Sequence, residues 1–195
     1  MKAIRKMYDW VLSWADSQYA TPALFLLAFT ESSFFPIPPD ILLIAMAISL
    51  PLRAFKYAAW CTIGSLAGGI VGYGIGSIGY ESIGKPIIDF YHAHDIMLAI
   101  KAQYDTYGFW GVLVAAITPI PYKVFTITSG FFDFSFPQFL GASIIGRSFR
   151  FFAVATLIWK YGAPIKSFID KYFNILATAA VVLLILGFLL IKVLV

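Results

Sequence analysis

The sequence has little charge, a single cysteine and two histidines. Charged residues make up 12% of its 195 residues, against about 25% in ordinary globular proteins. Cys61 has no second cysteine to pair with, and its apolar sequence neighbours favour a small buried hydrophobic side chain. With 61% hydrophobic residues and a mean hydropathy of +0.85, the chain is predicted to be an integral membrane protein. Its length suits one domain of roughly four to six membrane elements.

The usual patterns of enzyme active sites and metal sites are also missing from the sequence. We find no nucleophile and base at convincing spacing, no glycine-rich nucleotide loop and no zinc pattern. His92 and His94 are two positions apart, so they would not share a helix face, and no third metal ligand follows by spacing. The net charge of +4 comes from scattered Lys and Arg. We therefore expect no enzyme, cofactor, metal or nucleic-acid partner.

The chain is organised around the stretch ESSFFPIPPD, which lies between two apolar runs. This stretch contains Glu31, Asp40, Pro36, Pro38 and Pro39. Proline lacks a backbone N–H and clashes with the preceding helical turn, so the prolines end the helix that precedes them. The flanking runs, 20–33 and 41–50, are too short to cross the ~30 Å hydrocarbon core. The sequence therefore predicts a re-entrant helical hairpin at about 20–50, with its tip inside the membrane.

The same pattern occurs again near residue 120. The sequence Pro-Ile-Pro is found at 36–38 and at 119–121, so that Pro119 and Pro121 interrupt a second apolar region. Paired proline-interrupted segments of this kind indicate an inverted repeat with a binding site near the membrane midplane. We therefore predict a second re-entrant hairpin at about 108–135, which enters from the opposite face.

Glycine recurs every fourth residue in the apolar segment 57–80. These glycines are Gly64, Gly68, Gly72 and Gly76. The spacing places them on one helix face, where small residues allow another backbone or a ligand to approach closely. Tight packing against a hairpin is the main interpretation, and direct substrate contact is the alternative. The packing could occur within the monomer or between protomers of a homo-oligomer.

The remaining segments complete a predicted all-α integral membrane protein. Residues 1–18 are expected to form an amphipathic interfacial helix, followed by a membrane domain at 19–160 and a C-terminal transmembrane helix within 161–195. The polar stretch 81–107 is interpreted as an extramembrane connection with an amphipathic helix at about 96–104. We thus expect two opposed hairpins, about three transmembrane helices and the interfacial helix.

The distribution of basic residues predicts the orientation in the membrane. If both hairpins return to the side from which they enter, three basic segments share one side. These segments contain Lys2, Arg5, Lys6, Arg53, Lys56, Lys160, Lys166 and Lys171, against Lys85 and Lys101 in the 81–107 connection. Basic residues favour the cytoplasmic side, so we expect a multi-pass protein with a cytoplasmic N-terminus.

Five ionisable side chains are predicted at membrane depth. They are Glu31, Asp40, Lys123, Arg147 and Arg150. They could neutralise one another in a purely structural network. Intramembrane charges are more often functional, and the two arginines share a helix face. Arginine presents a fork suited to phosphate, so the cations could bind an anionic headgroup, while Glu31 or Asp40 could accept and release a proton.

Three motifs in combination resemble a known family. They are ESSFFPIPPD, the glycine-rich GSLAGGIVGYGIG, and TPIPYK followed by Ser129-Gly130. Over about residues 19–160 they resemble the DedA family, also called SNARE-associated or VTT-domain proteins, and in particular its short YqaA-type branch. This resemblance implies paired re-entrant hairpins and transport of lipids across the bilayer. Bacterial members are linked to undecaprenyl phosphate recycling and proton-motive force, and eukaryotic relatives to phospholipid scrambling.

The resemblance also implies roles for individual residues. Glu31 and Asp40 match the essential acidic positions of the first hairpin. Thr118 and Lys123 differ from the family, because many members have arginines there, and an ammonium group lacks the fork of a guanidinium. The function expected is a flippase or scramblase for an anionic phospholipid or polyprenyl phosphate in the bacterial cytoplasmic (inner) membrane. The alternative is a proton-coupled transporter of a small soluble ion or solute.

Overall fold

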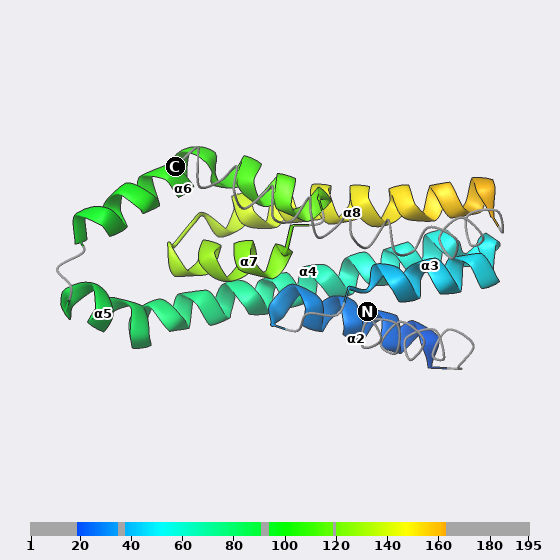
Figure 1. Ribbon diagram of the computed structural model, residues 1–195, viewed down its shortest axis with the longest axis horizontal. Coiled ribbons are helices and arrows are strands. Elements are labelled where there is room, and N and C mark those ends of the chain that lie inside the picture. Colours follow the sequence, from blue (N-terminus) through cyan, green and yellow to red (C-terminus); the bar gives the residue numbers. More distant parts are fainter. Residues whose placement is uncertain (1–18, 35–37, 91–93, 119, 163–195) are drawn as a thin grey trace, which may run out of the picture.

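The structure of the chain is a computed structural model that describes residues 19–34, 38–90, 94–118 and 120–162 (Figure 1). Within these ranges the regular secondary structure is helical and includes no strand, which confirms the predicted all-α fold class. The predicted interfacial helix at 1–18 lies outside the described residues, and so do residues 163–195, which make up nearly all of the range predicted to hold the C-terminal transmembrane helix.

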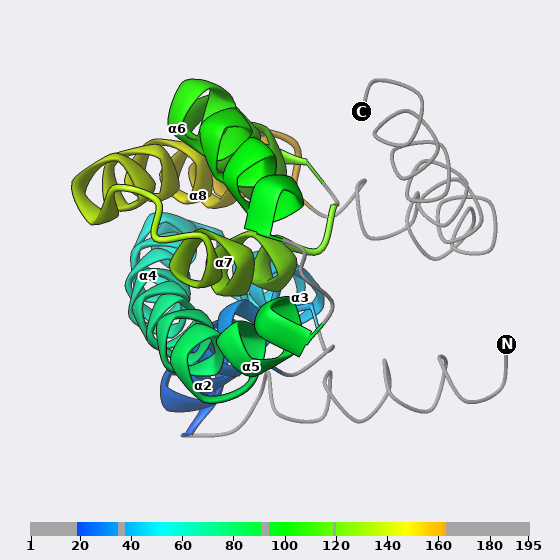
Figure 2. The same ribbon diagram turned by 90° about the vertical axis from the view of Figure 1, so that its left-hand side faces the viewer.

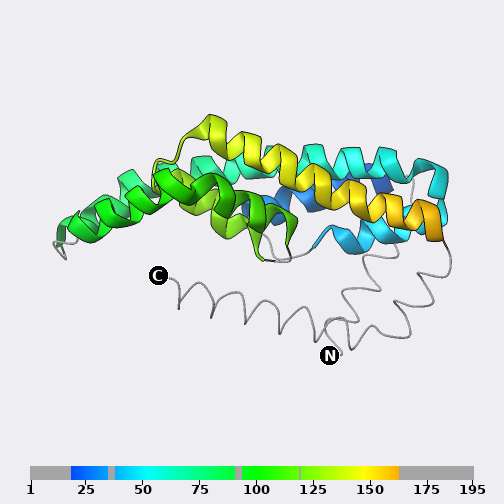
Figure 3. The ribbon, with the colours of Figure 1, turned by 90° about the horizontal axis from the view of Figure 1, so that it is seen from above.

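Two pairs of helices fold back at a proline-containing break. The first pair is α2 (Ala20–Ser33) and α3 (Asp40–Ser49), and the second is α6 (His94–Ile117) and α7 (Tyr122–Phe131). In Figures 1 and 3 the two breaks point toward one another from opposite ends of the molecule. Pro39 directly precedes α3 and Pro121 directly precedes α7, where the helix does not need the missing N–H. Pro38 is described, whereas Pro36 and Pro119 lie outside the described residues.

Two long helices pack beside these pairs. They are α4 (Ala54–Gly79) and α8 (Phe136–Tyr161). The short turn η1 (Pro51–Arg53) precedes α4, and a π-helical turn, η2 (Tyr80–Gly84), connects α4 to α5 (Lys85–Phe90). Among the described residues, the segments 51–90 and 136–161 are long and apolar enough to cross a membrane. The 26 residues of α8 correspond to about 39 Å of helix, which exceeds the ~30 Å hydrocarbon core.

The outward faces of α4 and α8 carry large apolar side chains. Those exposed include Ile63, Ile70, Val71, Ile75 and Ile78 on α4, and Ile144, Ile145, Phe149, Phe152 and Leu157 on α8. Buried polar side chains include Ser32, Ser65, Thr126, Ser129, Ser143 and Arg147. An apolar surface around an interior that contains hydroxyl groups and a guanidinium suits lipid surroundings, where polar groups turn toward the protein.

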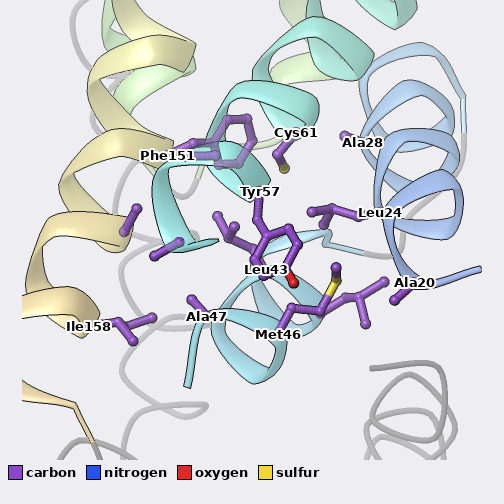
Figure 4. Close-up of a cluster of buried hydrophobic side chains, with 14 residues drawn as sticks. Ala20, Leu24, Ala28, Leu43, Met46, Ala47, Tyr57, Cys61, Phe151 and Ile158 are labelled. Carbon is purple, nitrogen blue, oxygen red and sulfur yellow. The ribbon is translucent and has the colours of Figure 1, made fainter. Parts of the chain in front are cut away.

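The larger hydrophobic cluster joins α2, α3, α4 and α8 (Figure 4). Its members include Leu24 and Ala28 from α2, Leu43, Met46 and Ala47 from α3, Tyr57 and Cys61 from α4, and Phe151 and Ile158 from α8. A smaller cluster joins α6, α7 and α8 with the turn between the last two, and it contains Val112, Tyr122, Phe134 and Phe139. Figure 2 shows α7 beside α4 and beneath α6 and α8. Tyr73 on α4 packs against the smaller cluster, so the two clusters hold the two helix pairs against the same long helices, α4 and α8.

The glycine face of α4 contacts both helix pairs. A Cβ added at Gly64 or Gly68 would overlap the backbone of α2, at Phe25 and Phe29 respectively. A Cβ at Gly72 would overlap Thr126 on α7, and one at Gly76 would overlap the carbonyl group of Ile127. The structure therefore uses this face for close backbone packing within the monomer.

The second helix pair differs from the predicted hairpin in the length of its first arm. The sequence predicted an amphipathic helix at about 96–104 and a separate apolar run from Gly108, but α6 is continuous from His94 to Ile117. Gly108 does not interrupt the helix because it packs against the ring of Phe134, whose Cε2 would lie 2.8 Å from an added Cβ. No proline occurs in α6 to force a break. The predicted connection at 81–107 is accordingly mostly helical.

Candidate functional site

The first break places two carboxylates on either side of the turn. Glu31 lies in the last turn of α2, and Asp40 is the first residue of α3. Their side chains are 15% and 19% exposed, so both carboxylates are largely removed from the surface. Carboxylates buried to this degree need cationic partners. Both partners come from α8.

Arg147 pairs with Glu31. Its Nη2 donates to Glu31 Oε2 at 2.6 Å and to Ser32 Oγ at 3.1 Å, and its side chain is 3% exposed. Its Nε donates to Ser65 Oγ on α4 at 2.5 Å. The two serine hydroxyls are 2.7 Å apart, and Ser32 Oγ donates to Glu31 Oε2 at 3.2 Å. These hydrogen bonds form a closed ring through Arg147, Ser65, Ser32 and Glu31. The ring offsets the free-energy cost of burying the two charges.

Arg150 pairs with Asp40 and also reaches the second break. Its Nε and Nη2 donate to the two carboxylate oxygens of Asp40 at 3.1 and 2.9 Å, a bidentate arrangement. Its Nη1 donates to the carbonyl oxygen of Thr118 at 2.5 Å, directly after the end of α6. One guanidinium therefore connects the start of α3 to the end of α6. Asp40 and Arg150 also suit the dipoles of these two helix ends, which favour an anion and a cation respectively.

A second contact between the helix pairs involves a backbone carbonyl that α2 leaves free at its end. Thr126 Oγ1 on α7 donates to the carbonyl oxygen of Ser32 at 3.0 Å. At the second break, Arg150 Nη1 donates to the carbonyl oxygen of Thr118 in the same way. Interrupted helices expose such carbonyl groups, which are costly inside a membrane unless another group bonds to them. The Thr126 hydroxyl satisfies the carbonyl of Ser32 at the first break, and the Arg150 guanidinium satisfies that of Thr118 at the second.

Two aromatic rings contact the guanidinium of Arg147. Its Cζ lies 4.6 Å from the centre of the Tyr122 ring and 4.9 Å from the centre of the Phe151 ring. Both rings are buried, and one comes from α7 and the other from α8. Sequence reasoning missed Ser32, Ser65 and these two aromatic residues. Serine and aromatic side chains are common in the apolar segments of this chain, so nothing local in the sequence distinguishes these four.

The structure brings four of the five predicted ionisable residues together. Lys123 is the exception, because its half-buried side chain forms no ion pair and no hydrogen bond with any described residue. The two acids and the two arginines form two adjacent ion pairs of balanced charge. Such a site could exchange a carboxylate for another anion on the same guanidinium, because carboxylate and phosphate oxygens use the same donors.

Comparisons with known proteins identify relatives of the chain. The family model described as the VTT domain matches residues 35–160, a range that includes Asp40, Arg147 and Arg150 and begins just after Glu31. An uncharacterised protein of Haemophilus influenzae is 33% identical over 192 residues, covering 98% of this chain and 100% of that protein. An uncharacterised protein of Histophilus somni is 33% identical over 191 residues, covering 95% and 100% respectively. No solved structure matches the chain.

The matched range begins at residue 35, just after the end of α2, and covers residues 35–39 of the first break and the whole of the second. It also includes the long helices α4 and α8. It therefore covers most of the elements that build the two ion pairs. The family is generally regarded as one of transporters. With nearly two thirds of its length matched, and with the apolar helices described above, the chain belongs to the VTT-domain (DedA) family of membrane proteins.

Proposed function

We propose that the protein is a flippase or scramblase that moves a lipid with an anionic headgroup across the bilayer. The substrate class is an anionic phospholipid or a polyprenyl phosphate such as undecaprenyl phosphate. The observation that carries this proposal is the pair of buried ion pairs, Arg147 with Glu31 and Arg150 with Asp40, where two interrupted helices approach one another. Arginine is the side chain best suited to a phosphate, because its fork can bind two oxygens at once.

The surroundings of the site support a lipid substrate. The long helices α4 and α8, which contribute to the site, have exposed apolar faces. A headgroup could therefore occupy the polar site while its hydrocarbon tail stays in the membrane. The breaks at 34–39 and 118–121 would form the tips of two re-entrant hairpins that enter from opposite faces. Alternate opening of the hairpins would give the headgroup access from each side. The N-terminus would lie in the cytoplasm, and the membrane would be the bacterial inner membrane.

Protons would regulate the same site. Glu31 and an anionic headgroup would compete for Arg147, because the carboxylate already accepts from Nη2. Protonation of Glu31 would remove this competition and leave Arg147 with a net positive charge. The groups that act on Glu31 include Arg147 and Arg150 on α8, Tyr122 on α7 and Ser32 on α2. Proton binding would thus favour anion binding.

Proton-coupled transport of a small soluble anion is the second candidate. The observation that favours it is the near-complete burial of Arg147, which is 3% exposed and therefore closed to a bulky headgroup in this conformation. A small anion could reach the guanidinium through a narrow water path, with Glu31 as the proton carrier. This candidate uses the same residues and differs in the route to them.

A reconstitution experiment separates the two candidates. The purified protein is placed in vesicles that contain a fluorescent phosphate-headed lipid, and the labelled lipid in the outer leaflet is quenched chemically. A lipid transporter exposes the inner-leaflet label to the quencher over time. Parallel vesicles with an internal pH dye and an external phosphate gradient report proton and anion flux. Lipid exchange supports the first candidate, and proton-linked anion flux without lipid exchange contradicts it and supports the second.

A further inference from the structure

Tyr122 occupies a closely defined position beside the ion pairs. It is the first residue of α7, directly after the second break, and it is 1% exposed. Its hydroxyl donates to Ser143 Oγ at 2.6 Å, and Ser143 Oγ donates to the carbonyl oxygen of Phe139 at 2.6 Å. A Cβ at Gly69 on α4 would lie 3.0 Å from the tyrosine hydroxyl. The phenol is therefore held by α8 and closely approached by α4.

The ring of Tyr122 and the ring of Phe151 both contact the guanidinium of Arg147. A guanidinium over aromatic faces is attracted to them through the ring quadrupole, most strongly where water is excluded. This contact restricts the orientation of the guanidinium plane. Lysine could not reproduce it, because an ammonium group has no plane to align with a ring.

The hydrogen bonds of Arg147 leave one of its nitrogens available. Nε donates to Ser65, and Nη2 donates to Glu31 and Ser32. Nη1 has no acceptor in the part of the chain that the structure describes. Arg150 differs, because all three of its nitrogens have acceptors in Asp40 and Thr118. Each guanidinium thus keeps two N–H groups, but only in Arg147 do both lie on one nitrogen, Nη1, that has no acceptor among the described residues.

We propose that Tyr122 is a positioning residue that, together with Phe151, orients Arg147 so that Nη1 can donate to a phosphate oxygen of the substrate headgroup. This inference rests on the proposed function and names the atom of the site that binds the headgroup. Tyr122 itself does not touch the headgroup. Because it directly follows the second break, a displacement of α7 moves the ring away from the guanidinium, which links headgroup binding to the position of the second helix pair.

The test compares two substitutions of Tyr122 in the vesicle assay. Tyr122→Phe keeps the ring and loses the hydroxyl, whereas Tyr122→Leu loses both. Exchange is measured at increasing mole fractions of phosphatidic acid, to obtain the half-saturating fraction and the maximal rate. We expect Tyr122→Leu to raise the half-saturating fraction about tenfold, the equivalent of one desolvated cation–π contact. The maximal rate should fall by much less, and Tyr122→Phe should remain closer to the wild-type protein.

A double substitution tests whether Tyr122 acts through Arg147. In an Arg147→Lys background the ring no longer has a guanidinium to orient, so Tyr122→Leu should cause little further loss. Additive effects of the two substitutions would overturn the proposal. So would a Tyr122→Leu variant with an unchanged half-saturating fraction, whether or not its maximal rate falls.

The failure of this inference can be distinguished from the failure of the proposed function. If the wild-type protein exchanges no lipid, the proposed function and the headgroup role fall together. The contact between Tyr122 and Arg147 is then decided by thermal unfolding of the same single and double variants in detergent. Non-additive unfolding temperatures support the positioning contact, and additive ones overturn it.

Discussion

Arg147 on α8 donates a 2.6 Å hydrogen bond to Glu31 on α2, a residue 116 positions earlier in the sequence. The bond connects the end of the first interrupted helix to the centre of a long apolar helix. Both charged groups are largely buried, and the same arginine also bonds to Ser32 and Ser65. The stability of the site therefore depends on keeping both partners, because either one alone would be a buried uncompensated charge.

We expect Arg147→Ala to destabilise the folded protein by about 3 kcal/mol or more, because it leaves the Glu31 carboxylate without its counter-charge. The protein should still insert into the membrane, since the apolar faces of α4 and α8 are unchanged. Arg147→Ala combined with Glu31→Ala should cost less than the sum of the two single substitutions. Thermal unfolding in detergent measures all three. Arg53→Ala, at an exposed position, is the control, and strict additivity would contradict the ion pair.

Arg150→Lys tests the connection between the two helix breaks. A lysine has one ammonium group, which cannot hold both oxygens of Asp40 and the carbonyl oxygen of Thr118 in the geometry of a guanidinium. We expect faster hydrogen exchange at the backbone amides around Asp40 and at the C-terminal end of α6. Arg53→Lys should leave both regions unchanged. Unaltered exchange in Arg150→Lys would show that the arginine does not hold the breaks together.

Two glycines on the same helix give a matched pair of substitutions. Gly68→Ala should strongly destabilise the protein, because its Cβ would overlap the backbone of Phe29 and no rotamer change can relieve that overlap. Gly74→Ala should be neutral or stabilising by up to about 1 kcal/mol, because nothing lies within 4 Å of the added Cβ and alanine favours the helix. Equal unfolding temperatures for the two variants would contradict the close approach of α2 to α4.

Thr126→Val removes the hydroxyl that bonds to the carbonyl oxygen of Ser32 and keeps the shape of the side chain. An unsatisfied buried carbonyl costs about 1–3 kcal/mol, so the unfolding temperature should fall. Thr106→Val is the control, because that hydroxyl is exposed and bonds only to Ala102 one turn earlier in its own helix. A drop of the same size in both variants would mean that the bond between α7 and α2 contributes nothing specific.

The sequence predicted the first helix pair closely because its limits are local. Prolines end helices whatever surrounds them, so α2 has the predicted range of 20–33 and α3 begins one residue before the predicted position. Gly108 has a weaker effect on a helix, of the order of 1 kcal/mol, which tertiary contacts can outweigh. Packing against Phe134 does so, and α6 continues through the position where a boundary was expected.

The site was predictable only in part, because helical spacing gives the face of a residue but not its partner on another helix. The spacing of Arg147 and Arg150 indicated a shared face. It could not assign Glu31 to the first arginine and Asp40 to the second, since that depends on how α2 and α3 pack against α8. Lys123 illustrates the same limit, because its position next to a proline break does not indicate whether its side chain pairs with an acid, and it forms no ion pair with a described residue. Its role in binding a headgroup stays a prediction.

The most direct test of the site is the rate of lipid exchange by Glu31→Gln compared with Glu81→Gln in vesicles that contain a fluorescent phosphate-headed lipid. Glutamine keeps the size of the side chain and removes the charge, and Glu81 is an exposed glutamate far from the ion pairs in the sequence. We expect Glu31→Gln to insert and fold but to lose exchange, because a glutamine cannot return to the charged form that competes with the headgroup for Arg147 and so releases it. Glu81→Gln should exchange lipid at the wild-type rate. Full exchange by a correctly folded Glu31→Gln protein would contradict a transport site at the buried ion pairs.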